Sequence, residues 1–103
     1  MAKAPQAPQE DKARLLRAAA FHIHRKRPAV EVLDEILGQE SRGGKARQWR
    51  ETFTALQERG FTAALETAGF ISSETALLLD LIVEDGDHRQ IAAALTRLAD
   101  AAG

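Results

Sequence analysis

The apolar residues of this chain recur every three or four positions, which is the spacing of amphipathic helices. Leu16, Ala20 and Ile23 follow this spacing over residues 10–25. A second run begins after Pro28, a residue that ends one helix and suits the first turn of the next. No stretch shows the two-residue alternation of a β-strand. The pattern predicts an all-α chain.

Glycines and capping residues divide the rest of the chain into further helices. Three glycines stand where helices should end: Gly60, Gly69 and Gly86. Four polar residues stand where helices should begin: Thr62 for the fourth, Ser72 or Ser73 for the fifth, and Asp87 for the sixth. The second helix is expected to end at Gly38 or in the loop of residues 41–44. The sequence therefore predicts a compact bundle of about six short helices, largely antiparallel neighbours because the loops are short.

The fifth predicted helix, ETALLLDLIVED, has one polar interruption, Asp80, in its apolar run. A helix that is apolar all round is usually buried, so we expect this one to be the most buried of the six. The predicted core comprises Leu33, Trp49, Phe53, Leu78, Leu81, Leu95 and Leu98.

The ends of the chain differ in composition and charge. The first nine residues, MAKAPQAPQ, hold two prolines and only one large apolar residue, Met1, which predicts a disordered arm ahead of a single helical domain over residues 10–103. The net charge of the 103 residues is −1, but residues 1–27 carry +5 and residues 61–103 carry −5. This polarity favours self-association or partners of opposite charge, although solvated faces at both ends would also explain it.

Candidate catalytic and metal-binding groups do not form a motif. There is no cysteine, and His22 and His24 lie two positions apart, on different sides of a helix. The segment SRGGKAR lacks the spacing of a phosphate-binding loop. We therefore expect no enzymatic activity and no metal or cofactor.

Two charged clusters are candidates for partner binding: Arg25, Lys26 and Arg27, and Glu84, Asp85 and Asp87. The basic cluster could contact phosphates, so a small helical DNA-binding regulator is the alternative function. Against nucleic acid, cations at the end of the first helix also suit its dipole, and the C-terminal half of the chain is acidic.

No apolar run approaches the length of a membrane span, and no signal peptide opens the chain, which predicts a cytoplasmic location.

From residue 15 to residue 99 the order of these features resembles one cytoplasmic domain of the type II secretion system protein F family. The similar segments are HRKRPAVEVLDEIL, RQWRETFTALQERGFTAAL and GFISSETALLLDLIVE, followed by Ile91, Leu95, Leu98 and Ala99. The family's GE..G motif has only Glu84 and Gly86 as counterparts, and its membrane segments and second domain copy have none. We therefore expect that the chain is not itself the platform protein.

The resemblance implies a non-catalytic protein-interaction module that docks to a secretion or envelope-assembly machine. The partner would be an assembly ATPase or a membrane complex, with the module at the periphery of the inner membrane. It also implies pairing between copies. The apolar fifth helix and the uneven charge of this sequence suggest two modes of pairing, through the fifth and sixth helices or between the first helix and the acidic end of another copy.

Overall fold

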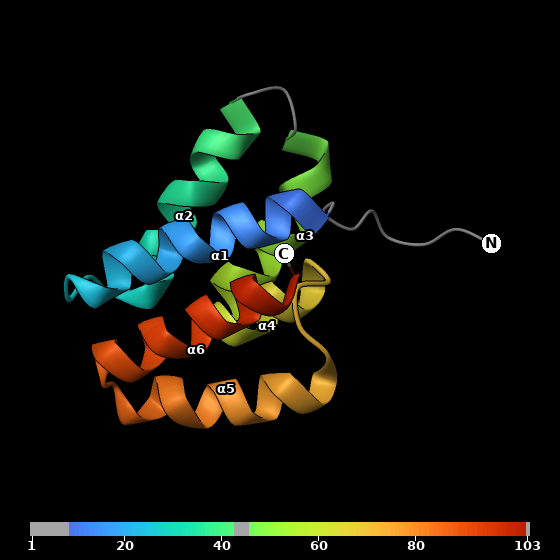
Figure 1. The fold of residues 1–103 in the computed structure, drawn as a ribbon. Coiled ribbons are helices and arrows are strands. Elements are labelled where there is room, and N and C mark those ends of the chain that lie inside the picture. The colour runs from blue at the N-terminus through green and yellow to red at the C-terminus, as the bar shows by residue number, and fades with distance from the viewer. Residues whose placement is uncertain (1–8, 43–45, 103) are drawn as a thin grey trace.

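The computed structural model describes residues 9–42 and 46–102 of the chain. The predicted arm over residues 1–9 lies outside this part, except for Gln9, at which the first helix begins. The described residues form six helices and no strand (Figure 1), which confirms the predicted all-α bundle. The helices are α1 Gln9–His24, α2 Ala29–Glu40, α3 Ala46–Arg59, α4 Phe61–Thr67, α5 Ser73–Asp85 and α6 His88–Ala102.

The first and last helices lie side by side although they are farthest apart in sequence. α1 packs against α6 more extensively than any other two helices pack, and the two run antiparallel (Figure 1). α2 packs on α1 and α3, and α3 packs on α4. Within the described residues, α5 contacts only α4 and α6, so it forms an outer edge of the bundle.

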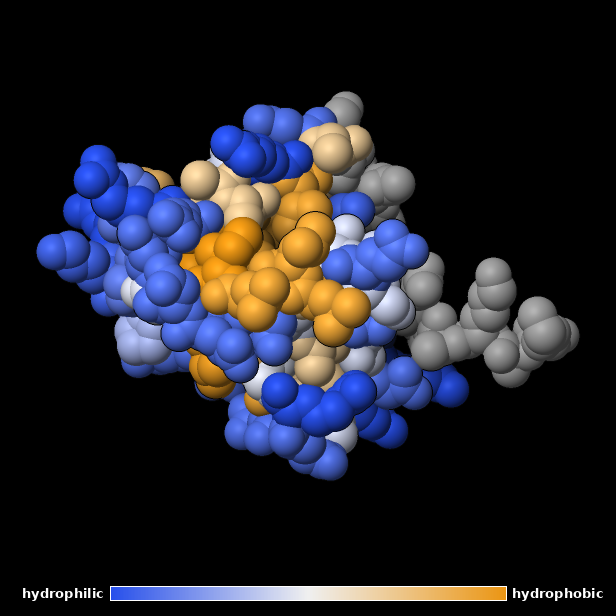
Figure 2. Space-filling view, turned by 90° about the horizontal axis from the view of Figure 1, so that it is seen from below, coloured by the Kyte–Doolittle hydropathy of each residue, from blue (hydrophilic) through white to orange (hydrophobic). Residues whose placement is uncertain are grey.

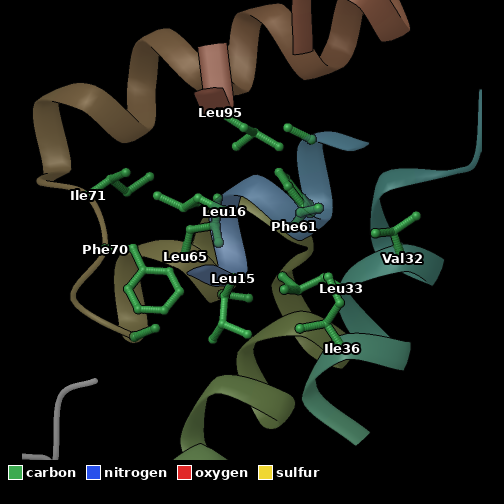
Figure 3. Packing of buried hydrophobic residues seen from close by; sticks show 14 of the residues in the cluster. Leu15, Leu16, Val32, Leu33, Ile36, Phe61, Leu65, Phe70, Ile71 and Leu95 are labelled. Atoms are coloured by element: carbon green, nitrogen blue, oxygen red, sulfur yellow. The ribbon is translucent and has the colours of Figure 1, made fainter. Parts of the chain in front are cut away.

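Apolar side chains from all six helices form a single core. Figure 3 shows how Leu15 and Leu16 of α1 converge with the side chains of α2, α4, α6 and the turn before α5. Trp49 of α3 is buried and meets the ring of Phe70 edge-on, with the ring centroids 6.1 Å apart. Edge-to-face packing of this kind adds to the free energy gained by burying two large rings.

The predicted core is correct in α2, α3 and α6 but wrong in α5. Leu33, Trp49 and Leu95 are buried, whereas Phe53 and Leu98 are partly buried against the core. The prediction is wrong for two leucines of α5: Leu78 is 65% exposed and Leu81 is 64% exposed. Only Ala76 and Leu79 of α5 are buried, so α5 is not the most buried helix, because no described element covers its outer side.

Most of the predicted helix ends are confirmed. Gly60, Gly69 and Gly86 follow α3, α4 and α5 with φ values of 104°, 81° and 80°, a region that glycine adopts without a Cβ clash. The Ser72 hydroxyl accepts a hydrogen bond from the Thr75 N–H at 3.2 Å and so caps α5.

The predicted start of α4 at Thr62 is wrong, and of the two predicted ends of α2 the later one, at residues 41–44, agrees with the structure whereas Gly38 does not. α4 begins at Phe61 with Gly60 as its N-cap, and Thr62 is buried inside the helix. Gly38 lies inside α2, which continues to Glu40. Both residues are tolerated within a helix. In α4 the buried Phe61 extends the apolar face ahead of Thr62, whereas in α2 the residue after Gly38 that makes tertiary contacts is Glu40, which pairs with Arg14.

Arg14 joins α1 to α2. Its guanidinium donates two hydrogen bonds to the carboxylate of Glu40, at 2.8 and 2.9 Å, and a third to Asp11 at 2.9 Å. These hydrogen bonds, first that to Glu40 and then that to Asp11, hold the pKa of Arg14 above its ordinary value. Glu40 of α2 therefore faces a permanent cation across the α1–α2 contact, while Asp11 holds the same cation from within α1.

Neighbouring leucines of α5 provide a test of its orientation. We expect Leu79→Ala to lower the free energy of unfolding by about 2–5 kcal/mol, because it leaves a cavity in the core. Leu78→Ala should change it by less than about 0.5 kcal/mol, because that side chain is mostly in solvent. Urea denaturation of both variants measures the difference, and equal losses would contradict the orientation described here.

Candidate interaction surfaces

The outer side of α5 carries an exposed apolar surface, here called the leucine face, made of Leu77, Leu78 and Leu81. These side chains are 72%, 65% and 64% exposed. Their spacing of three and four residues places them together on one side of the helix. Figure 2, seen from the α5 side, shows an apolar patch surrounded by hydrophilic residues. Large contiguous apolar patches on soluble proteins often coincide with interaction sites, which makes the leucine face a candidate docking surface.

The apolar surface continues into a hollow between α5 and α6. This hollow has a volume of about 230 Å³ and is lined mainly by apolar side chains, among them Leu78, Ile82 and Leu98. Arg97 of α6 lies on its border. A partner side chain placed on the leucine face therefore has a recess next to it.

The charged residues of α5 are all acidic. Glu74 precedes the leucine face along the helix, Asp80 lies within the same stretch, and Glu84 and Asp85 follow it. All four are exposed, and α5 contains no lysine, arginine or histidine. Of the predicted acidic cluster, Glu84 and Asp85 therefore lie at the end of the leucine face.

Asp87, the third member of the predicted acidic cluster, has a local role. Its Oδ1 accepts hydrogen bonds from the backbone N–H groups of Arg89, at 2.9 Å, and Gln90, at 3.3 Å. These bonds cap the N-terminus of α6, as the sequence predicts.

The predicted basic cluster is divided among three environments. The guanidinium of Arg27 pairs with Glu31 at 3.0 Å and with Glu35, so its positive charge is compensated by two carboxylates of the same chain. Lys26 is exposed in the turn after α1. Arg25 lies over the ring of Phe21, with its Cζ 5.2 Å from the ring centroid.

The turn after α1 has the hydrogen-bond pattern of a Schellman motif. The N–H of Lys26 donates to the carbonyl of Ile23 at 2.8 Å, and the N–H of Arg27 donates to the carbonyl of His22 at 3.4 Å. Lys26 has a φ of 70°, a conformation that glycine usually occupies at this position.

A second surface, here called the basic groove, lies between α1 and α6. It has a volume of about 820 Å³, and its lining contains no carboxylate. Its basic side chains come from both helices: Arg17, His24 and Arg25 from α1 and the turn after it, and Arg89 and Arg97 from α6. Its remaining lining residues are Ala20, Phe21, Ala92, Ala93 and Thr96.

Most cations of the basic groove lack an acidic partner. Arg17 forms an ion pair with Asp100 at 2.9 Å near one end. No ion pair within residues 9–42 and 46–102 involves Arg25, Arg89 or Arg97. Unpaired arginines around an open groove attract an anionic ligand.

The histidines do not gather at one place. His22 is half-buried beside the Phe21 ring, with the ring centroids 5.3 Å apart, and His24 borders the basic groove. His88 is at the start of α6. In the part of the chain that the structure describes, no three histidine, aspartate or glutamate side chains are arranged to hold a metal ion.

No helix among the described residues is long and apolar enough to cross a membrane. Comparison of the chain with protein-family models, curated proteins and solved structures gives no significant match. The resemblance to the type II secretion protein F family therefore stays a prediction from the sequence.

The turn after α1 gives a second stability test. Lys26→Gly should raise the free energy of unfolding by about 0.5–1 kcal/mol, because glycine adopts this φ without strain from a Cβ. Lys26→Ala removes the same charge but keeps the Cβ, so it should leave stability within about 0.5 kcal/mol of the parent. Denaturation midpoints measure both, and stabilisation by alanine equal to that by glycine would assign the effect to charge instead.

Proposed function

We propose that this chain is a non-catalytic protein-interaction module and that the leucine face is its docking surface. The observation that carries the proposal is the exposure, by 64–72%, of three neighbouring leucines on one helix. Full burial of a leucine side chain contributes about 1.5–3 kcal/mol. Covering three side chains that are about two-thirds exposed would thus contribute several kcal/mol, against the entropy that association costs.

The acidic residues of α5 define the chemistry of the partner. A complementary surface has an apolar strip to cover Leu77 and Leu81 and basic side chains to meet Glu74, Glu84 and Asp85. Matched charges around an apolar centre increase the association rate and the specificity more than the affinity. Glu84 and Asp85, predicted from the sequence as partner-binding residues, would act in this way.

The resemblance to the secretion platform domain supports a partner in a secretion or envelope-assembly machine. Under this proposal the module works in the cytoplasm, at the inner membrane face of that machine, with the assembly ATPase or a membrane complex as its partner. The likeness covers the segments quoted above and includes α5 as far as Glu84.

Site-specific photo-crosslinking in the native cell tests the docking surface. A photoreactive residue at Leu77 or Leu81 should give a defined crosslinked protein, whereas the same residue at Glu58, exposed on α3, should not. Adding Leu78→Ser should abolish the crosslink without unfolding the chain, because Leu78 is mostly exposed. Crosslinks of equal yield from Glu58, or crosslinks that persist with Leu78→Ser, would refute the proposed docking surface.

A further inference from the structure

We propose that the leucine face docks into the basic groove of a second copy of this chain, so that copies associate head to tail. The inference rests on the proposed function, because it names a second copy as one partner of the same α5 surface; the terminal copy of a head-to-tail chain keeps its leucine face free for the assembly ATPase or membrane complex. It also assigns a ligand to the basic groove, namely an acidic, leucine-bearing helix. Within one molecule the two surfaces cannot meet, because α5 packs on α4 and α6 with its leucines directed outward.

The charges of the two surfaces are complementary. α5 carries Glu74, Asp80, Glu84 and Asp85 with no base. The basic groove carries four arginines and a histidine, and Arg25, Arg89 and Arg97 have no acidic partner within the described part of the chain. Docking would therefore bring unpaired acids next to unpaired arginines, an arrangement that favours encounter at low salt.

The shapes of the two surfaces are also compatible. At 1.5 Å per residue, the 13 residues of α5 span about 20 Å, while α1, with 16 residues, and α6, with 15, span about 24 and 22 Å. The lining of the groove, however, covers only residues 17–25 of α1 and the turn after it and 89–97 of α6, about 14 Å along each helix, so it can hold the central turns of α5, which carry Leu77 and Leu81, but not its whole length. Ala20, Ala92 and Ala93 let a third helix approach closely, and Phe21, 57% exposed, offers an apolar contact for the leucines.

A symmetric dimer through two copies of α5 is less favourable. In an antiparallel pair, Glu74 of one copy would face Glu84 and Asp85 of the other. In a parallel pair, each acid would face itself. Like charges at close range oppose both arrangements, whereas the basic groove neutralises them.

Nucleic acid is also a poorer fit to the groove than a short acidic helix. Asp100 pairs with Arg17 near one end, and Asp87 lies two residues before Arg89 at the other. A polyanion that extends beyond the groove would meet these carboxylates and the acids of α5.

Head-to-tail association is heterologous. In a dimer of this kind one copy has a free leucine face and the other a free basic groove, so further copies can add until a chain forms or a ring closes. One helix face in one groove is at the small end of stable interfaces. We therefore expect weak association, detectable at about 10–100 µM. Light scattering of the purified chain should show a mass above 11.2 kDa that rises with concentration and falls when salt is raised from about 0.05 M to about 0.5 M.

Two variants, each with one surface removed, test the geometry. A groove variant carries Arg25→Glu and Arg89→Glu, and a face variant carries Leu77→Gln and Leu81→Gln; all four positions are exposed. Each variant alone should remain at 11.2 kDa, and an equimolar mixture should form a dimer of about twice that mass and nothing larger. Arg47→Glu with Arg50→Glu, two exposed arginines of α3, makes the same charge change away from both surfaces and should assemble like the parent.

The other outcomes are distinct from one another. A groove variant that still dimerises alone would show a symmetric α5 dimer and overturn the inference. Binding of a DNA duplex that is lost in the groove variant and that dissociates the mixed dimer would assign the groove to nucleic acid and also overturn it. A parent chain that stays at 11.2 kDa up to about 1 mM would refute self-docking. In that case the photo-crosslinks from Leu77 and Leu81 to a different protein would still support the proposed function.

Discussion

The antiparallel packing of α1 against α6 is the constraint on which the rest of the structure depends. Its buried residues are mostly small or unbranched at Cβ, and include Ala19, Ala20, Ala92, Leu95 and Ala99. Small side chains let the two helix axes approach closely, which leaves a shallow groove above the line of contact. The arginines that flank this line cannot enter the contact, so they surround the groove.

The same contact explains why α5 is exposed on one side. Gly86 and Asp87 form the short turn between α5 and α6, so α5 must lie next to α6. Because the inner side of α6 is occupied by α1, α5 can bury only a narrow strip against α6 and α4. Ala76 and Leu79 fill that strip, and the remaining leucines lie outside it. The exposed face thus follows from the chain connectivity and from where α6 is already packed.

Local features of the sequence predicted the helices well, because their causes are local. The glycines at positive φ and the caps at Ser72 and Asp87 depend only on residues a few positions away, so their places follow from the sequence alone. The environment of Arg27 was also readable, since Glu31 and Glu35 follow it at one and two helical turns. The three consecutive bases nevertheless look alike in sequence, although only Arg27 of the three forms these ion pairs among the described residues.

The two surfaces were harder to predict, because each depends on contacts between distant residues. The apolar run of α5 is the same whether or not another helix covers it, so Leu78 and Leu81 could not be assigned from hydropathy. Arg89 and Arg97 are a minority in an acidic segment, and only the fold brings them opposite Arg17 and Arg25. The net charge of residues 61–103 therefore predicted the acidic surface on α5. It did not predict the basic groove, because the arginines of α6 are outnumbered by acids in the same segment.

The distance along the chain between α1 and α6 also bears on protein synthesis. α1 is the first of the six helices to emerge from the ribosome, yet α6, against which it packs most extensively, is the last. Closing so long a loop costs entropy that only the completed contact repays. While α2 to α5 are being made, the apolar side of α1 stays uncovered by its final partner, and a nascent chain in this state is a substrate for chaperones.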